Sequence, residues 1–451
     1  MDRVAVADTH IPREEGTGSV SRPTVGVIGL GYVGLSYAVA FAEAGCAVVG
    51  CDVLPSRVAM INRGESPLPD ILTDATVAAQ VTAGRLTATT EDAPLAACDA
   101  FIIAVPTPVT PTYDPDLSMV RDAMARIARV LRAGQLVILE CTTYPGTTDE
   151  LIVPIVRQAG FAIGTDVFVA YSPERIDPGN TSSQGWTMRN TPKVVGGVTP
   201  ACTERAVALY RLVSENIVPV SSPRVAEMEK LVENIFRVVN VALVDELALL
   251  SDRMGIDIWE VLDAAATKPY GYMKFVPGPG LGGHCIPVDP LYLAWKAKAY
   301  DMPTRFVELA VEIDRQMPYH VRDLVSRALN GQKKPVNGSN VLLLGVAYKP
   351  DVADTRETPA APLWRLLAAD GAAIRYHDPH VPVFRLPDGT PAHSTPLTEE
   401  ALREADCVVV VTHHSRVDYR RVVALASAVV DTRGITRGIP VEEGGAVITR
   451  L

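Results

Sequence analysis

Long hydrophobic runs are absent from this 451-residue sequence. No segment offers 18 uninterrupted apolar residues, so we expect no membrane-spanning helix and no membrane partner. Residues 1–22 include acidic side chains and lack the apolar stretch of a signal peptide, so we interpret them as a flexible tail. Positive charge is also in deficit, because 42 Lys and Arg face 52 Asp and Glu, for a net charge of −10. This balance argues against nucleic acid as the main partner.

Cysteine is scarce and shows no metal-binding or disulfide pattern. The seven cysteines are odd in number and lack a repeated C-x-x-C spacing. This argues against a disulfide framework and a structural zinc site, and a reducing cytoplasm fits best. We therefore expect a cytoplasmic protein without a metal ion. The composition, 48% hydrophobic and 21% charged, is that of an ordinary globular protein, and the length predicts two or three domains.

The chain from Thr24 to Asp52 has the order strand, glycine-rich turn, helix and second strand. This order is typical of the opening of a βαβ unit. Further apolar runs at 99–108, 135–143 and 166–174 alternate with helical stretches, which predicts a doubly wound sheet of parallel strands. Polar residues follow these runs, at the carboxyl ends of the strands, where such sheets bind ligands.

A similar order of elements recurs between 339 and 434, which predicts a second unit of the same kind. Between the units, 223–254 has the pattern of one long helix closed by Gly255. The second half of this helix is apolar on nearly every side and must be covered, between domains or at a subunit interface. We predict an α/β protein with two doubly wound Rossmann-like domains joined by a long central helix and a helical linker domain. The expected divisions are a tail at 1–22 and domains at 23–212, 213–325 and 326–451.

Gly29, Gly31 and Gly34 form the pattern G-x-G-x-x-G directly after a strand, and Asp52 ends the second strand. The glycines let the backbone approach a pyrophosphate at a helix N-terminus, and the carboxylate accepts hydrogen bonds from a ribose diol. An Asp here favours NAD over NADP, because a 2′-phosphate would meet a like charge. Arg57 complicates this preference, since it could pair with a phosphate. The alternative is a glycine turn that serves only tight packing of helix on strand.

The segment 277–300, PGPGLGGHCIPVDPLYLAWKAKAY, places Cys285 just before a helix expected to start near Pro290. A thiol close to a helix N-terminus has a lowered pKa and becomes nucleophilic. The alternative is a buried cysteine that packs as a small hydrophobe. Asp289 also has two interpretations, as a helix N-cap or as a holder of water. His284 is set aside, because adjacent side chains usually point apart.

Lys230 and Asn234 lie four residues apart, and therefore on one face of the predicted long helix. Such a polar stripe can face a site. The alternative is a solvated face on which Lys230 pairs with Glu227 or Glu233. Glu174, at the end of a strand of the first unit, is a candidate base, although a carboxylate before an Arg is more often an ion-pair or turn residue.

Seven motifs, in this order, resemble the UDP-glucose/GDP-mannose dehydrogenase family. They lie between about residues 24 and 434 and are GLGYVGL, AVPTP, TTYPGTT, SPE, EKLVENIFR, GGHCIPVDP and YKPDVADTRE. GPGLGGHCIPVDP and PERIDPGN are most similar to the branch that oxidises UDP-N-acetylhexosamines. The resemblance implies an oxidoreductase of polysaccharide biosynthesis that oxidises the C6 hydroxymethyl of a nucleotide sugar to a carboxylate with two NAD per turnover. The implied substrate is UDP-N-acetylglucosamine or UDP-N-acetylmannosamine.

The resemblance also implies roles for individual residues. Cys285 forms a thiohemiacetal and then a thioester, Lys230 stabilises the oxyanion or acts as acid or base, and Asp289 holds the hydrolytic water. The implied catalytic set is Cys285, Lys230, Asp289, Asn234, Glu174 and Thr143. The implied cofactor contacts are Gly29, Gly31, Tyr32, Val33, Gly34, Asp52, Arg57, Thr107, Thr143 and Arg356. The implied UDP-sugar contacts are Glu174, Lys230, Asn234, Gly282, Lys349 and Arg433.

By the same resemblance, NAD binds within 23–212 and the UDP-sugar within 326–451, while 213–325 carries the catalytic Lys and Cys and joins two subunits. Two features depart from the family pattern. Members often supply an arginine from a partner subunit on the loop before the cysteine, and this chain offers only Lys268 or Lys274 there. Cys141 replaces what is more often a small hydroxyl residue, which suggests a site open to oxidation.

Other functions are compatible with parts of the pattern. A UDP-glucose 6-dehydrogenase is the alternative within the family. A two-electron dehydrogenase of a small 3-hydroxy acid shares Lys-x-x-x-Asn on a long helix, but it has no need for Cys285. A nucleotide-sugar binding protein without activity has no need for Cys285, Lys230 and Asp289 together. We expect a homodimer or higher homo-oligomer through the apolar half of 223–254.

Overall fold

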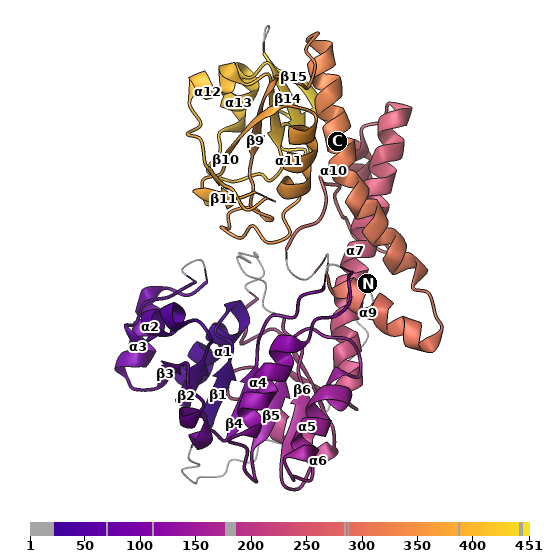
Figure 1. Cartoon of the computed structure of the whole chain (residues 1–451). Helices are drawn as coiled ribbons and strands as arrows, with labels where there is room; N and C mark the ends of the chain where they lie inside the picture. The colour runs from indigo at the N-terminus through magenta and orange to yellow at the C-terminus, as the bar shows by residue number, and fades with distance from the viewer. Residues whose placement is uncertain are drawn as a thin grey trace.

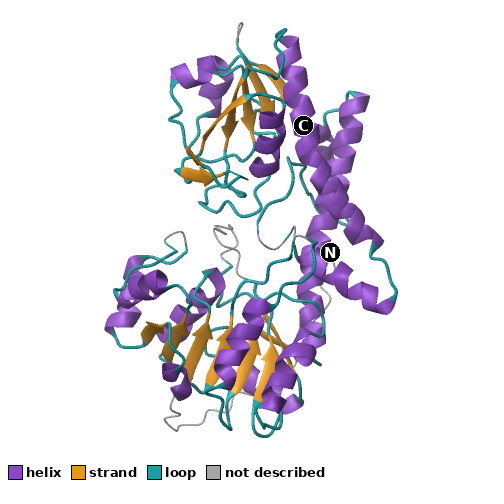
Figure 2. Ribbon diagram, in the orientation of Figure 1, coloured by secondary structure: helices purple, strands orange, loops and turns teal. Residues whose placement is uncertain are grey.

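Two α/β units lie at opposite ends of a pair of long helices in the computed structural model (Figure 1). The structure describes residues 22–68, 71–110, 112–175, 186–283, 286, 288–386, 388–441 and 445–451. Helices cover both faces of each sheet (Figure 2), which is the doubly wound arrangement that the sequence predicts. Among the described helices, none is both long and apolar enough to cross a membrane.

The first unit is built on a sheet with strand order β3-β2-β1-β4-β5-β6-β7-β8. Its strands are β1 Thr24–Ile28, β2 Ala47–Cys51, β3 Leu86–Thr89, β4 Ala100–Ile103, β5 Leu136–Leu139, β6 Phe168–Tyr171, β7 Lys193–Gly197 and β8 Ile217–Val220. Its helices are α1 Tyr32–Glu43, α2 Pro55–Asn62, α3 Asp74–Thr82, η1 Ala93–Ala97, α4 Ser118–Ala128, η2 Thr148–Ile152, α5 Val153–Gln158 and α6 Pro200–Tyr210.

One strand pair of this sheet departs from the predicted parallel pattern. β7 runs antiparallel to β6, whereas the other pairs are parallel. A fully buried strand is a short apolar run in either direction, so its polarity is not encoded in the residues themselves. The predicted parallel arrangement holds for the runs up to 166–174, and β7 lies beyond those runs.

The second unit is built on a parallel sheet with strand order β10-β9-β13-β14-β15. Its strands are β9 Asn340–Leu344, β10 Ala373–His377, β13 Cys407–Val410, β14 Ala428–Asp431 and β15 Val447–Arg450. Its helices are α11 Ala360–Ala369, α12 Glu399–Glu404 and α13 Tyr419–Leu425, and a small antiparallel ribbon is formed by β11 Val383–Arg385 and β12 Pro391–His393.

The two units open in the same way. Gly29 has a φ of +89°, and the next amide, of Leu30, donates to Asp52 Oδ2 at 2.8 Å. In the second unit Gly345 has a φ of +82°, and the next amide, of Val346, donates to Asp378 Oδ2 at 2.8 Å. A left-handed glycine after the first strand and an aspartate after the second thus fix both βαβ turns. The prediction that residues 339–434 repeat the order of elements of the first unit is therefore confirmed, including the geometry of the turn.

The long helix α7 (Pro223–Met254) connects the units. The Ser222 side chain accepts from the Val225 amide at its start, and Gly255 adopts the left-handed conformation after its end. It packs against α10 (Arg305–Gly331), with Val238 and Ala242 among the buried contacts. The other helices of this region are α8 Ile258–Ala266, α9 Asp289–Ala297 and η3 Lys298–Tyr300.

Candidate active site

The N-terminus of α1 has the geometry of an anion site. A Cβ on Gly34 would lie 1.8 Å from the Gly29 carbonyl oxygen, so this position requires glycine for close packing of helix on strand. Gly31 is the N-cap, has no side chain to cap the helix, and would meet no neighbour through an added Cβ. The first-turn N–H groups are therefore left for a ligand, and the residues present fit a dinucleotide pyrophosphate.

Asp52 is buried beside this turn. Its Oδ2 accepts from the Leu30 amide and from Arg57 at 2.9 Å, and Oδ1 accepts from the Leu54 amide at 2.9 Å. A carboxylate has about four lone-pair sites, so Oδ1 keeps capacity for a further donor such as a ribose hydroxyl. Arg57 is occupied by this ion pair, which argues against the phosphate pairing considered from the sequence.

The second unit reaches the cofactor loop of the first. The Arg356 guanidinium lies 4.9 Å from the centroid of the Tyr32 ring, at the first residue of α1, and pairs with Asp354. Tyr32 and Val33 are both half-buried. The carboxyl ends of β1 and β9 therefore face each other, and a molecule bound at one edge meets residues from the other.

A second group of polar side chains lies where α7 meets α9. Lys230 Nζ donates to the Glu174 carbonyl oxygen at 2.5 Å, and Asn234 Nδ2 donates to Asp289 Oδ2 at 2.5 Å. The polar stripe predicted on the long helix thus contacts two other predicted site residues. The alternative pairing of Lys230 is not observed, since Glu233 pairs with Arg175 and Glu227 accepts from the Gly146 and Thr148 amides.

Asp289 does not serve as the N-cap considered from the sequence. It is the first residue of α9, whose N-cap position has no side-chain hydrogen bond, and its carboxylate turns to Asn234 instead. Burial raises the pKa of Asp289 to about 7, although Lys230 and the Asn234 hydrogen bond both favour the ionised form. A carboxyl group that titrates near neutrality is suited to proton transfer.

The loops after β4 and β5 bring two threonines, Thr107 and Thr143, to the same region. Thr143 is fully buried, and its Oγ1 has no hydrogen-bond partner among the described residues. Thr107 Oγ1 instead donates to the Thr142 carbonyl oxygen at 2.8 Å. A buried hydroxyl without a protein partner is costly, so Thr143 fits contact with a water or ligand atom.

Cys141 lies in the loop after β5. The sequence suggested that this thiol is open to oxidation, and the structure contradicts that expectation. Its thiol donates to the Ile103 carbonyl oxygen and accepts from the Val105 amide, and burial raises its pKa to about 12. Oxidation requires an accessible thiolate, and this thiol is neither exposed nor ionised.

Sequence reasoning missed a buried ionic group behind Glu174. Lys193 Nζ lies 2.6 Å from Glu140 Oε1 and donates to the Pro173 carbonyl oxygen at 3.1 Å. The Tyr37 hydroxyl, on α1, hydrogen-bonds the Glu174 side chain. These contacts fix the backbone just before Glu174 and connect it to the dinucleotide helix. The one sequence signal was a lysine at the start of the apolar run KVV.

The glycine-rich segment before the cysteine packs against the second unit. An added Cβ on Gly278 would lie 2.6 Å from an Arg433 nitrogen, and one on Gly282 would lie 2.7 Å from Tyr348 Cβ. Asp245 Oδ1 accepts from the Gly278 amide at 2.9 Å. Glycine is therefore needed here for close approach. Cys285 and His284 lie outside the described residues.

The expected substrate cations lie beside this segment. Arg433 donates to the Val411 carbonyl oxygen, and burial lowers its pKa to about 10. Lys349 is half-buried and adjoins Tyr348, the residue that contacts Gly282. The two lysines considered as substitutes for a partner arginine make other contacts, because Lys274 pairs with Asp263 and Lys268 lies over the Tyr270 ring.

An uncapped glycine-rich helix start in an α/β unit, together with a group of half-buried Lys and Asn and buried Asp and Glu side chains, defines a dinucleotide-dependent oxidoreductase. Comparison with known proteins agrees. Models of the UDP-glucose/GDP-mannose dehydrogenase family match residues 23–214 (NAD binding domain), 224–316 (central domain) and 342–438 (UDP binding domain).

The chain is 36% identical over 434 residues to a UDP-N-acetyl-D-mannosamine dehydrogenase of Yersinia pestis, covering 93% of this chain and all of the relative. It is 35% identical over 423 residues to an NDP-N-acetyl-D-galactosaminuronic acid dehydrogenase of Ralstonia nicotianae, covering 91% and 96%. A solved UDP-D-ManNAc dehydrogenase of Pyrococcus horikoshii superposes with a TM-score of 0.84 at 31% identity, covering 95% and 98% of the two chains. The chain belongs to the UDP-glucose/GDP-mannose dehydrogenase family and is an NAD-dependent nucleotide-sugar dehydrogenase.

Proposed function

We propose that this enzyme oxidises the C6 hydroxymethyl of a UDP-N-acetylhexosamine to a carboxylate, with Cys285 as the nucleophile. Support comes from relatives whose names specify N-acetylated sugar nucleotides. The observation that carries the proposal is the joint placement of Lys230, Asn234, Asp289 and Glu174 at the meeting of α7, α9 and the end of β6. A two-electron dehydrogenase needs no buried carboxyl to hold water, whereas conversion of an alcohol to an acid does.

The overall reaction removes two hydrides from the sugar carbon and adds one water oxygen. The alcohol first loses a hydride and a proton to give an aldehyde. Addition of the Cys285 thiolate to the aldehyde gives a thiohemiacetal, and loss of a second hydride gives a thioester. Water then displaces the thiolate, which leaves a carboxylate and regenerates the cysteine. NAD, when bound at Gly29–Gly34 and Asp52, supplies the acceptor for each hydride.

Lys230 stabilises the negative oxygen that develops when sulfur adds to the aldehyde. Among the described residues its ammonium donates only to the Glu174 carbonyl oxygen, so two N–H donors are left for a ligand. A single donor to such an oxygen contributes about 3 kcal/mol to transition-state stabilisation.

Asp289 takes the proton of the attacking water. Its ionised form is favoured by Asn234 and by the Lys230 charge and is opposed by burial. The carboxylate therefore ionises near neutrality and is basic enough to accept a proton. Thr143, whose hydroxyl has no partner among the described residues, orients the same water, and Glu174 is the second carboxylate proposed for this step.

The substrate-side residues come from the second unit. Lys349 and Arg433 hold the diphosphate and sugar, and Gly282 allows the glycine-rich segment to approach Tyr348, the residue before Lys349. The buried charge of Arg433 faces the segment that leads to the cysteine, so substrate binding and the position of the nucleophile are linked.

A substrate panel tests the choice of sugar. UDP-N-acetylglucosamine, UDP-N-acetylmannosamine, UDP-N-acetylgalactosamine, UDP-glucose and GDP-mannose are compared by kcat/KM under one condition. The proposal expects an N-acetylated UDP-sugar to lead. A wide margin for UDP-glucose would establish the alternative within the family.

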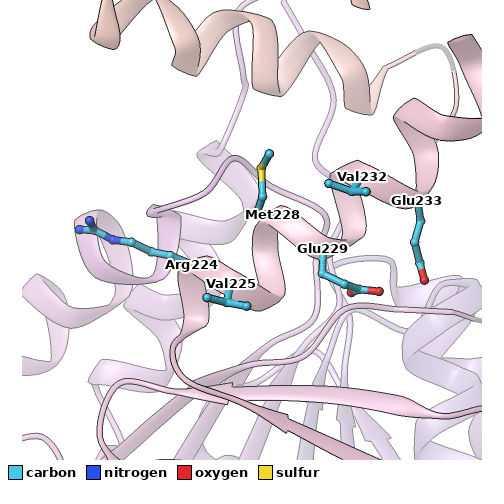
Figure 3. A pocket seen from close by; sticks show the side chains of 6 residues that line it. All are labelled: Arg224, Val225, Met228, Glu229, Val232 and Glu233. Carbon is cyan, nitrogen blue, oxygen red and sulfur yellow. The ribbon is translucent and has the colours of Figure 1, made fainter. Parts of the chain in front are cut away.

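The enzyme acts as a homodimer through α7. Apolar side chains stay exposed along its whole length at spacings of three, four and seven residues, at Val225, Met228, Val232, Phe236, Leu243, Leu247, Leu250 and Met254. Near its start they line an open groove of about 440 Å³, bordered by Arg224, Glu229 and Glu233 (Figure 3). A continuous apolar stripe on a helix of 32 residues suits a second copy of the same helix.

A further inference from the structure

Three side chains from separate loops converge at the carboxyl edge of the second sheet. Asp351 follows β9, His380 follows β10 and His414 follows β13. One ligand atom of each lies within 4.8 Å of the other two. Because these three strands are parallel neighbours, their following loops meet at one edge of the sheet.

The separations suit a shared cation better than direct hydrogen bonds. Asp351 Oδ1 lies 3.5 Å from His380 Nε2 and 3.8 Å from His414 Nδ1. Ligands about 2.0–2.2 Å from a tetrahedral zinc ion are roughly 3.3–3.5 Å apart. A contraction of a few tenths of an ångström on the second pair would bring both distances into that range.

His414 is held in the protonation state that a metal requires. Its Nε2 lies 3.1 Å from Asp378 Oδ2, and its Nδ1 accepts from the Asp351 amide at 3.0 Å. The proton therefore resides on Nε2, and Nδ1 presents a lone pair. A carboxylate behind a histidine ring is the usual second layer of a metal site, because it fixes the ring and raises its basicity. When a cation binds, His414 Nδ1 gives up the weak hydrogen bond from the Asp351 amide and forms a coordinate bond to the metal instead.

His380 supplies the independent observation. Its Nε2 is inaccessible to solvent and has no hydrogen-bond partner among the described residues. A buried imidazole nitrogen without a partner is destabilising, and a cation beside Asp351 satisfies it. Asp351 itself is fixed in place, since it holds a φ of +59° while its Oδ1 accepts from the Ser415 amide and hydroxyl.

We propose that Asp351, His380 and His414 bind one divalent cation of the zinc type, with Asp378 and Ser415 as supporting residues. Two imidazoles favour such a metal over Mg²⁺ or Ca²⁺, which prefer oxygen ligands. Three protein ligands leave a fourth position for water or another oxygen. Asp351 is 44% exposed in its side chain, so the cluster is open to solvent on that side. The cation would join three loops, including the one that carries Lys349.

The test is zinc binding by the tag-free, full-length protein after removal of metal with a chelator. Zn²⁺ alone is titrated in competition with a chromophoric chelator, and Co²⁺ alone is followed by its visible absorption. We expect one equivalent bound per chain with micromolar or tighter affinity. His380→Ala and Asp351→Asn should each weaken binding at least tenfold, as is usual for loss of one ligand, and His393→Ala, exposed on β12 of the same unit, should not.

A second readout separates loss of the site from loss of the fold. Zn²⁺ should raise the melting temperature of the wild type but not that of His380→Ala, whose circular dichroism should match the wild type. Cys285→Ser should bind as tightly as the wild type, because the cluster does not involve that thiol. The proposal fails if no stoichiometric binding occurs, if His380→Ala binds like the wild type, or if Cys285→Ser removes the binding.

Discussion

The Asn234 amide on α7 donates to the Asp289 carboxylate on α9 at 2.5 Å, although the two residues are 55 positions apart in the chain. Burial raises the pKa of the Asp289 carboxyl group to about 7, and the Lys230 charge and the Asn234 donor both oppose the rise by favouring the ionised form. The proposed mechanism uses this carboxylate as its base.

The first prediction concerns pH. In the proposed mechanism the ionised carboxylate of Asp289 is the active form, so kcat should fall about tenfold per unit below pH 7 and level off above it. Asn234→Ala removes a donor that stabilises the ionised form, so the acidic limb should move to higher pH. Asp289→Asn should lose about 10²-fold or more and show no such limb. Steady-state pH profiles measure this, with Asn240→Ala, half-buried on the same helix, as the matched control. An unmoved limb in Asn234→Ala would contradict the assignment.

The second prediction concerns the cofactor. Arg356 lies over Tyr32 at 4.9 Å and should contribute to NAD binding from the second unit. A cation–π contact at a partly exposed site is worth about 0.5–1 kcal/mol, so Arg356→Ala should raise the KM for NAD roughly two- to fivefold. The KM for the sugar nucleotide should change less. Arg365→Ala, exposed on α11, is the control. Equal effects on both KM values would show that Arg356 acts on the fold rather than on the cofactor.

The third prediction concerns stability. Lys193→Met leaves the Glu140 carboxylate buried without its cation and should destabilise the protein by about 3–5 kcal/mol at pH 8. Burial already raises the pKa of Glu140 to about 7, and loss of Lys193 raises it further. At pH 5 the carboxyl group is protonated and the loss should be smaller. Thermal denaturation at both pH values tests this, with the exposed Lys298→Met as control. Equal losses of stability at pH 5 and pH 8 would mean that the unpaired charge of Glu140 is not the cause.

The fourth prediction concerns assembly. The wild type should be a dimer in light scattering, and Leu247→Glu together with Leu250→Glu should give a monomer, because two charges would enter the apolar stripe of α7. Val447→Lys, also exposed but on β15, should leave the dimer intact. A monomeric wild type would remove α7 as the interface.

Local signals in the sequence predicted the fold well. The limits of α7 were predictable because Ser222 caps its start and Gly255 supplies the left-handed residue after its end. The two βαβ turns were predictable for the same reason, since only glycine tolerates the conformation of Gly29 and Gly345. The direction of β7 was not, because a buried apolar strand has no intrinsic polarity.

From residue spacing alone, without the family resemblance, the site was predictable only where its residues share one element. Lys230 and Asn234 lie on one helix face, so their spacing was informative. Their partners Glu174 and Asp289 come from other elements, and only the fold brings them there. The same holds for the pair Glu140–Lys193, which no local pattern connects. Cysteine spacing could not reveal a cluster made of His and Asp from three loops.

The yield of NADH from a limiting amount of UDP-N-acetylhexosamine tests the proposed mechanism most directly. We expect two NADH per sugar for the wild type, because both oxidations occur before the acid is released. Cys285→Ala should give no more than one, since without sulfur addition the aldehyde cannot lose a second hydride. A wild-type yield of one, or a yield of two from Cys285→Ala, would contradict it.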